Sequence, residues 1–181
     1  MVANLLQFSV KKLLMDNYNK INEEVYYFNK PITYISNKDI KFIKNKAKKN
    51  YSQKCRLCTH KNEKDNFQEM FIVHTKNCYI RPHYHIDKVE SLQVIEGKAD
   101  LYIFNTSGHV ISKKLLGDPL SKRTYYYRIN KKIIHMLIIK SDFFVFKETA
   151  SKPFNRKMMI FPKWSPEYFN FKFFNKVIRK K

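Results

Sequence analysis

The stretch that decides the fold runs from residue 82 to residue 97 and reads Pro82-His83-Tyr84-His85-Ile86-Asp87-Lys88-Val89-Glu90-Ser91-Leu92-Gln93-Val94-Ile95-Glu96-Gly97. Side chains alternate along a strand, so His83 and His85 point to the same face. A turn after His85 brings the next strand back beside the first, which places Glu90 near both imidazoles. Two neutral nitrogens and one carboxylate oxygen are typical ligands of a first-row transition metal. Gly97 closes the returning strand, where a turn requires unusual backbone angles.

This spacing resembles the first motif of the cupin superfamily, in which His-x-His is followed after four residues by Glu and after six more by Gly. The second cupin motif supplies a further histidine, for which His135 is the candidate. Cupins usually carry Pro-x-Gly before that histidine, whereas this chain has Asn130 and Lys132 at those places. The resemblance implies that His135 completes the ligand set formed by His83, His85 and Glu90.

Length and composition bound the architecture. The 181 residues are 44% apolar and 15% aromatic, which is enough for one domain with a core and short extensions. The formal net charge of +21 attracts polyanions and anionic substrates without specifying either. The basic residues are scattered and form no recognised nucleic-acid motif. We therefore do not expect nucleic acid to be the partner, although it stays open as an alternative.

Three cysteines, Cys55, Cys58 and Cys78, and the lack of a secretion signal indicate reduced thiols and a cytoplasmic protein. Cys55-x-x-Cys58 followed by His60 is open to a zinc interpretation. A lone pair of this kind is a weak zinc signal, and on a strand the two thiols face opposite sides. We interpret them as structural thiols. No run of residues is long and apolar enough for a transmembrane segment.

Three regions follow from the pattern of apolar residues. Residues 1–31 form an N-terminal extension, in which helical spacing over residues 3 to 22 predicts an amphipathic helix that docks on the domain or on a second subunit. Binding to a membrane surface is the alternative. Residues 32–167 form the main domain, which begins with a helix from about Lys38 to Asn50, capped by Ser36 or Asn37. Residues 168–181 form a basic C-terminal tail.

Short strands separated by turn residues fill the rest of the main domain. We predict them at residues 55–60, 68–74, 79–85, 91–96, 100–105, 109–115, 125–129, 134–139 and 143–147, with one or two more between Val25 and Ser36. Regular short strands without long helices between them predict an antiparallel sandwich or barrel. The fold class is therefore all-β. An antiparallel double-stranded β-helix, the cupin jelly roll, with one or two short N-terminal helices fits the strand count.

Several other side chains are candidates for the site. The register Phe144, Phe146, Glu148 places Glu148 near the metal-binding layer as a second carboxylate and general base, or alternatively as a strand-end carboxylate paired with a lysine. Five residues are candidates for binding an anionic group at the mouth of the pocket: Arg56, Arg81, Lys88, Tyr126 and Arg128. The histidines at positions 60, 74 and 109 lack partners at ligand spacing.

Several segments together resemble one cupin family, the WbuC-type cupin fold metalloproteins. They are Arg56–His60, Gln68–Val73, Tyr79–His85, Ile95–Gly108, Tyr126–Ile129, His135, Val145–Thr149 and Phe161–Glu167. The match covers roughly residues 33 to 167. It implies a β jelly roll with one divalent transition metal (zinc, manganese, iron or nickel). It also implies an association with bacterial surface-polysaccharide biosynthesis, for O-antigen or capsule.

The resemblance leaves the reaction open, so three functions stand beside one another. The first is a metal-dependent enzyme that isomerises or epimerises a sugar or nucleotide sugar. The second is an iron-dependent oxygenase, because three histidines and one glutamate also suit Fe(II). The third is a non-enzymatic module that binds a sugar and regulates polysaccharide assembly. Cupins often pair through a sheet edge, so a homodimer is an expectation of the resemblance.

Overall fold

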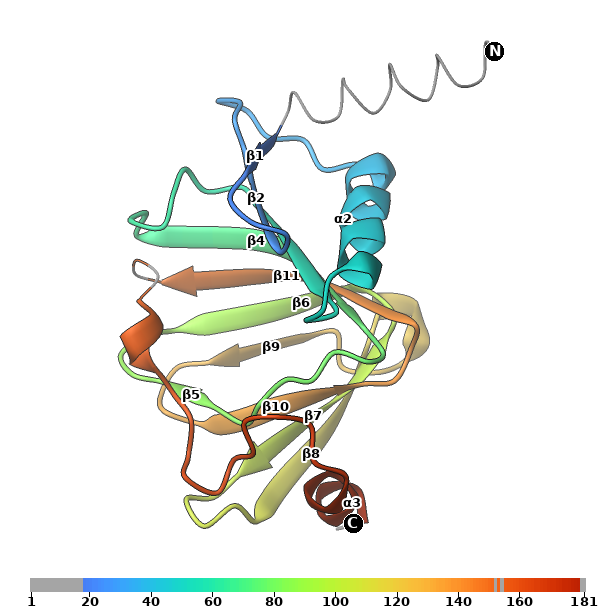
Figure 1. Cartoon of the computed structure of the whole chain (residues 1–181), viewed down its shortest axis with the longest axis vertical. Helices are drawn as coiled ribbons and strands as arrows, with labels where there is room; N and C mark the ends of the chain where they lie inside the picture. Colours follow the sequence, from blue (N-terminus) through green and yellow to red (C-terminus); the bar gives the residue numbers. More distant parts are fainter. Residues whose placement is uncertain (1–17, 152, 154, 180–181) are drawn as a thin grey trace.

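The computed structural model describes residues 18–151, 153 and 155–179, and strands dominate it (Figure 1). The strands are β1 (Tyr18–Lys20), β2 (Val25–Phe28), β3 (Lys54–Cys58), β4 (Phe67–Thr75), β5 (Tyr84–His85), β6 (Glu90–Glu96), β7 (Lys98–Phe104), β8 (Val110–Gly117), β9 (Tyr126–Ile129), β10 (Ile134–Ile139), β11 (Phe143–Ser151) and β12 (Met159–Ile160). The helices are α2 (Asn37–Lys49), α3 (Phe171–Arg179) and two 3-10 turns, Pro119–Ser121 and Arg156–Met158.

Two sheets face each other. The larger sheet has the order β1-β2-β3-β4-β11-β6-β9, and the smaller has the order β10-β7-β8. A backbone bridge between His83 and His135 joins β5 to the free side of β10, and β12 pairs with β5. The order β4-β11-β6-β9 opposite β5-β10-β7-β8 is that of an eight-stranded jelly roll. The predicted all-β fold class and the cupin-type jelly roll are therefore confirmed.

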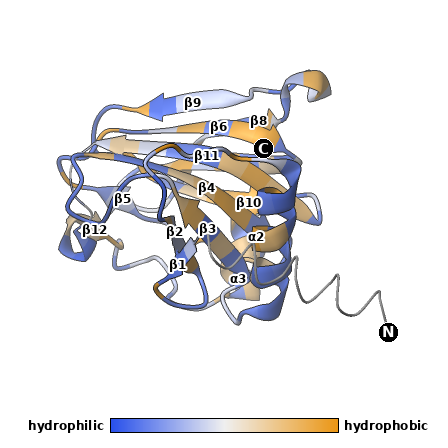
Figure 2. Cartoon of the chain, turned by 90° about the horizontal axis from the view of Figure 1, so that it is seen from above, coloured by the Kyte–Doolittle hydropathy of each residue, from blue (hydrophilic) through white to orange (hydrophobic). Residues whose placement is uncertain are grey.

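The main core lies between the sheets. Met70, Ile72, Phe144 and Phe146 project from the larger sheet and meet residues of the smaller sheet such as Leu137. Alternate positions on these strands are apolar on the inner side, as the strand period requires. Figure 2 shows that the hydrophobic segments lie on the strands, whereas the connecting loops are largely hydrophilic. One end of the space between the sheets stays polar, and the candidate site lies there.

Helix α2 covers the outer face of β3 and β4. Ile43 and Ala47 are buried against Leu57 and Val73 in a second apolar cluster. The Ser36 backbone N–H donates to Asp39 Oδ2 at 2.6 Å, which is one half of a capping box at the start of the helix. The predicted helix and its cap are confirmed.

The N-terminal prediction is wrong at the end that the structure describes. Most of the predicted amphipathic helix, residues 3 to 17, lies outside the described residues. Tyr18 to Lys20 form strand β1 rather than a helix and pair antiparallel with β2. Tyr18 is buried against Phe28 and Phe42, and its hydroxyl donates to Asp39. These contacts with α2 and β2 outweigh the local helical spacing.

One further strand is shorter than predicted, and the C-terminal tail, for which the sequence predicted no secondary structure, contains a helix. Only Tyr84 and His85 of the predicted strand at residues 79–85 form a strand, because Pro82 has no backbone N–H for a ladder. The C-terminal tail contains helix α3, whose Val177 packs with Trp164 against Phe104 on the outer side of the smaller sheet. Within the described residues, no helix combines the length and apolar character needed to cross a membrane.

Gly97 joins β6 to β7, where the chain passes from one sheet to the other. Its φ is +87°, and a Cβ atom there would lie 2.1 Å from the Phe143 carbonyl oxygen. Both facts require glycine, so the prediction made for this turn is confirmed. The predicted turn after His85 also occurs, with Asp87 in the left-handed region at φ +56°.

Candidate metal centre

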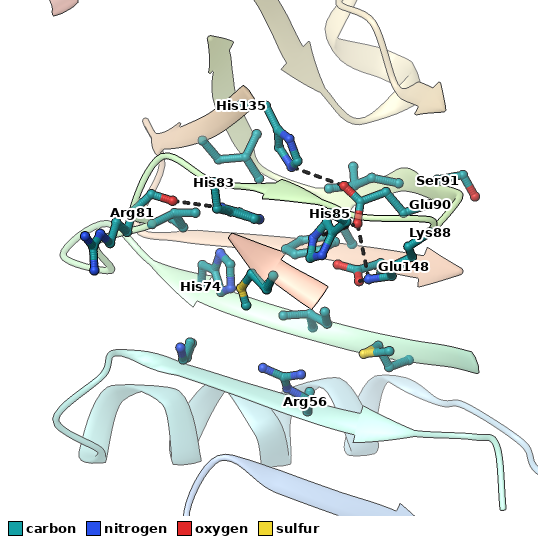
Figure 3. A pocket seen from close by; sticks show the side chains of 18 of the residues that line it. Arg56, His74, Arg81, His83, His85, Lys88, Glu90, Ser91, His135 and Glu148 are labelled. Atoms are coloured by element: carbon teal, nitrogen blue, oxygen red, sulfur yellow. Dashed lines mark hydrogen bonds and ion pairs between the residues drawn. The ribbon is translucent and has the colours of Figure 1, made fainter. Parts of the chain in front are cut away.

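Three histidines converge at the polar end of the space between the sheets. The backbones of His83 and His135 exchange two hydrogen bonds of 3.1 and 2.9 Å, which fixes the two residues side by side. His85 follows two residues later on β5. One nitrogen from each of the three rings lies within 4.8 Å of the others, and this cluster could hold a metal ion. Figure 3 shows the three side chains facing the same cavity.

The rings of His83 and His135 are oriented by the backbone. His83 Nδ1 lies 2.8 Å from the Arg81 carbonyl oxygen, and His135 Nδ1 lies 2.9 Å from that of Ile133. A carbonyl oxygen only accepts, so both Nδ1 atoms donate, which leaves Nε2 as the nitrogen of each ring that is available to a metal. This arrangement orients metal-binding histidines in general. The donor set therefore fits a transition metal.

Burial keeps two of these rings neutral. It lowers the pKa of His83 to about 3 and that of His85 to about 4, with further lowering at His83 from the neighbouring His135. A neutral imidazole is the form that binds a metal. Near neutral pH both rings are therefore ready to act as ligands without first losing a proton.

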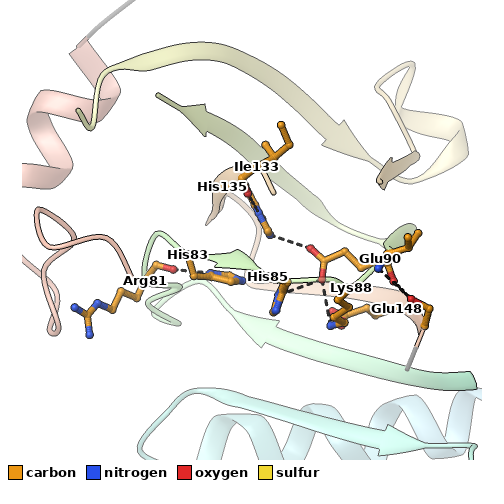
Figure 4. Close-up of polar contacts among 10 residues, drawn as sticks. Arg81, His83, His85, Lys88, Glu90, Ile133, His135 and Glu148 are labelled. Carbon is orange, nitrogen blue, oxygen red and sulfur yellow. Dashed lines mark hydrogen bonds and ion pairs between the residues drawn. The ribbon is translucent and has the colours of Figure 1, made fainter. Parts of the chain in front are cut away.

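Glu90 lies beside the imidazoles, at the start of β6. Its Oε2 atom is 3.2 Å from His85 Nε2, and its Oε1 atom is 3.1 Å from His135 Nε2 (Figure 4). Burial alone would raise the pKa of Glu90. The hydrogen bond with His135 and the nearby positive charge of Lys88 outweigh burial, so the pKa is lowered and the carboxylate is ionised. Glu90 thus contacts two of the three imidazoles, whereas the residues whose ligand atoms all lie within 4.8 Å of one another are the three histidines alone. The role of Glu90 as a fourth ligand stays a prediction.

Lys88 connects two carboxylates. Its Nζ atom is 3.2 Å from Glu90 Oε2 and 3.5 Å from Glu148 Oε1. Burial lowers the pKa of Lys88, but the two carboxylates more than offset this effect and the net shift is upward. Glu148 lines the same cavity as the histidines and pairs with Lys88, so the inward register and the ion pair with a lysine, the two alternatives left open by the sequence, both occur. Lys88 is therefore an internal counter-ion of both acidic groups.

The cavity around these groups has a volume of about 280 Å³. Among the residues predicted to bind an anion, Arg56, Arg81 and Lys88 line it. Tyr126 and Arg128 are exposed on β9 and are not among the lining residues, whereas Tyr127 between them is. The alternation of β9 explains the difference, because adjacent side chains on a strand point to opposite faces.

Arg81 is occupied by other groups. Its Nε atom donates to Ser165 Oγ at 3.0 Å, and its Nη2 atom donates to the Ser165 carbonyl oxygen at 2.9 Å. Its guanidinium carbon lies 4.4 Å above the centre of the Phe161 ring. Arg81 therefore fastens the C-terminal segment to the rim of the cavity, while its own carbonyl orients His83.

Sequence reasoning missed Lys54 and His74, which also line the cavity. His74 Nδ1 is buried without a hydrogen-bond partner among the described residues. Burial lowers the pKa of His74 to about 3, and the positive charges of Lys54 and Arg56 add to this effect. The available signal was the alternation Met70, Ile72, His74, which puts this histidine on the inner face.

The remaining candidates have structural environments. Cys55 belongs to the cluster under α2 and Cys58 to the core between the sheets, so the two thiols face opposite sides as predicted. Both are buried and free. His60 Nδ1 lies 2.8 Å from the Glu69 carbonyl oxygen, and His109 is exposed. These histidines lie apart from the cluster of His83, His85 and His135.

Comparisons with known proteins give a partial family match. A family model described as "Domain of unknown function (DUF6016)" matches residues 35–116, which include His83, His85, Glu90 and Gly97 and end before His135. No curated protein matches the sequence.

Several solved structures resemble part of the chain. The capsular polysaccharide assembling protein CapF from Staphylococcus aureus is 15% identical with a TM-score of 0.47, over 59% of this chain and 32% of that one. Protein SO0799 from Shewanella oneidensis is 11% identical with a TM-score of 0.46, over 57% and 66%. Oxalate decarboxylase from Bacillus subtilis is 13% identical with a TM-score of 0.44, over 54% and 24%. The jelly roll assignment depends on strand order and not on these likenesses.

Proposed function

We propose that this protein is a metal-dependent cupin that isomerises or epimerises a sugar in bacterial surface-polysaccharide biosynthesis. The main support for the proposal is that one cavity contains both a potential metal site and a second, separate carboxylate. Three metal-competent imidazoles lie beside Glu90, and a second carboxylate, Glu148, lies on the other side of Lys88. A metal site and a separate proton-transfer group are the two parts that such a reaction requires.

The metal would be held by His83, His85 and His135, with Glu90 as the fourth ligand. When bound, a divalent transition metal supplies Lewis-acid polarisation of a carbonyl or hydroxyl oxygen. The protein contributes two imidazoles oriented by backbone carbonyls and one ionised carboxylate, so metal binding requires little rearrangement of these side chains.

Glu148 is the proposed base. It takes the proton from the hydroxyl-bearing carbon next to the sugar carbonyl, which leaves an enediolate. The hydroxyl proton then passes to the former carbonyl oxygen, and Glu148 returns its proton to the former carbonyl carbon, so the carbonyl moves by one carbon without net loss of atoms. The Lys88 ammonium, 3.5 Å away, holds this carboxylate in place. Leu92, Tyr127 and Phe146 line the cavity beside it and exclude water from the reacting carbon.

The sugar class is supported by the sequence resemblance to WbuC-type proteins and by the mixed lining of the cavity. The lining combines charged groups with aromatic and aliphatic groups, which suits a polyhydroxylated ligand with apolar C–H faces. The high positive net charge also favours approach of an anionic sugar derivative.

Solvent exchange tests the proposal directly. Metal-loaded protein is incubated in D2O with a panel of aldoses, ketoses and uronic acids, and deuterium at the carbon next to the carbonyl is followed by NMR. We expect exchange with the wild type and loss of exchange in Glu148→Gln, with metal content unchanged. Glu96→Gln, which alters an exposed acid paired with Lys44, is the matched control.

Absence of exchange with every sugar would contradict the proposal. Oxygen consumption instead would identify an oxygenase, and sugar binding without exchange would identify a binding module.

A further inference from the structure

The wall of the cavity formed by β3 and β4 carries basic side chains with few acidic partners. Lys54 and His74 are directly opposite each other in the antiparallel register of β3 and β4, and Arg56 faces Ile72 in the next pair. Side chains two residues apart on a strand share a face, so Lys54 and Arg56 both point inward with His74. All three line the cavity. Figure 3 shows His74 between the histidine cluster and Arg56.

The other cations of the cavity are already matched. Lys88 lies between Glu90 and Glu148, and Arg81 is bound to Ser165 and stacked on Phe161. Within the described part of the chain, no carboxylate lies within ion-pair distance of Arg56, and Lys54 reaches only Glu24, at 3.6 Å. A guanidinium without a partner in a cavity wall retains its full capacity to donate hydrogen bonds.

His74 gives a second, independent indication that this wall of the cavity binds an anion. Its ring packs edge-on against Phe146 at 5.2 Å between centroids, deep in the wall, and its buried Nδ1 has no partner among the described residues. Two cations beside a neutral, unsatisfied imidazole form a local field that an added negative charge would stabilise. Guanidinium, ammonium and imidazole N–H groups are donors that match the oxygens of an oxyanion.

We infer that Arg56, Lys54 and His74 form an anion subsite that binds a carboxylate or phosphate of the substrate. The part of this inference that places the reacting end of that substrate at the histidine cluster rests on the proposed function. A volume of about 280 Å³ lies at the lower limit of small-molecule pockets. It therefore suits a single acidic monosaccharide, a sugar acid or sugar phosphate, and not an entire nucleotide sugar. The acidic group at β3 and β4 orients the sugar along the cavity.

Anion binding at fixed ionic strength tests the subsite. Inorganic phosphate, glucose 6-phosphate, D-glucuronate and D-glucose are titrated by calorimetry into wild type, Arg56→Gln and Arg128→Gln. We expect saturable binding of at least one anion and no binding of glucose. Affinity should fall about tenfold or more in Arg56→Gln, because a charge-assisted hydrogen bond is lost, and stay unchanged in Arg128→Gln. Arg128 is an exposed arginine outside the cavity, so it controls for the general surface charge. Comparing the affinities of inorganic phosphate and glucose 6-phosphate with that of D-glucuronate shows whether the subsite prefers a phosphate or a carboxylate.

Two results would overturn the subsite: no saturable binding of any anion to the wild type, or equal binding to wild type and Arg56→Gln. Arg56→Lys keeps the charge but loses the two-pronged geometry, so a smaller, several-fold loss is expected. If the unfolding temperature shows that Arg56→Gln does not fold, the comparison with wild type is made with Arg56→Lys instead. The same titrations on metal-free His83→Ala separate the two proposals, because an intact subsite still binds the anion when the metal site is gone.

Discussion

Lys88 is the residue on which the electrostatics of the cavity depend. It is the counter-ion of Glu90, which faces the imidazoles, and of Glu148, which faces the substrate space. Two carboxylates at this depth without a cation would repel each other and lack solvation. The lysine therefore offsets the charge of Glu90 and lies between this carboxylate and Glu148, the proposed base.

Replacing Lys88 with methionine should destabilise the metal-free protein by about 2 to 4 kcal/mol, because the buried Glu90 and the half-buried Glu148 lose their shared cation. Urea denaturation at neutral pH measures the change. The control is Lys44→Met, which breaks an ion pair with the half-exposed Glu96 and should cost less than about 1 kcal/mol. Equal effects of the two substitutions would show that Lys88 has no special role.

His74 predicts a pH dependence of stability. Its folded pKa, about 3, lies below the ordinary value of 6.5, so on acidification the unfolded chain takes up the proton first. The contribution is complete above about pH 6.5 and is lost progressively as the pH falls toward 3. In metal-free His74→Phe, the slope of unfolding free energy against pH should be shallower by roughly 1 kcal/mol per pH unit between pH 6 and pH 4. Parallel curves for wild type and variant would show that His74 is not buried in its neutral form.

Residues at the site differ in how far sequence could predict them. The candidate ligands follow from motif spacing: the structure gathers His83, His85 and His135 into one cluster and places Glu90 against His85 and His135. Lys54 and His74 are far apart in sequence and meet only through the register of β3 with β4. That register is fixed by packing of the two sheets and α2, so no local pattern reveals it.

At the scale of elements, the strands were predictable and their ends less so. Short apolar segments identified β6, β7, β10 and β11 to within a few residues, because each strand buries at least one face, and β7 and β10 bury both. The helical spacing near Tyr18 gave the wrong element, since β1 is held by pairing with β2 and by contacts with α2. Long-range contacts of this kind override local preference.

The link between β6 and β7 should tolerate no side chain at Gly97. Gly97→Ala combines a positive φ with a clash against the Phe143 carbonyl oxygen. This oxygen belongs to the backbone, so it cannot move away by a change of rotamer. We expect a loss of more than about 2 kcal/mol in the free energy of unfolding, measured by urea denaturation. Lys98→Ala, at the next and exposed position, is the control. A loss below about 0.5 kcal/mol, as is usual for surface substitutions, would contradict the strain argument.

At the scale of the whole molecule, the described parts of the predicted extensions pack on the jelly roll. Strands β1 and β2 continue the larger sheet beyond β3, and α3 covers the smaller sheet. The boundaries at residues 31 and 168, and the homodimer expected from the resemblance, stay predictions. The net charge of the chain is +21; within the cavity, Lys88 is matched by two carboxylates, whereas Arg56 has none within ion-pair distance among the described residues.

This charge predicts weak, non-specific attraction to nucleic acid. Binding to a duplex DNA fragment should weaken steeply between low and physiological salt, since it rests on counter-ion release. It should be the same in wild type and in Arg56→Gln when the two are compared by fluorescence anisotropy, because a cavity side chain does not face a polymer. Tight binding at physiological salt that the cavity substitution abolishes would favour a nucleic-acid function instead.

The central claim is that His83, His85, Glu90 and His135 hold one transition metal. Elemental analysis of protein purified without added metal or a chelating tag tests it most directly, beside a His83→Ala, His135→Ala double variant. We predict near-stoichiometric zinc, manganese, iron or nickel in the wild type, and its loss in a variant that is still folded by circular dichroism. Wild-type protein that stays free of metal after reconstitution, or a double variant that keeps it, would contradict the account.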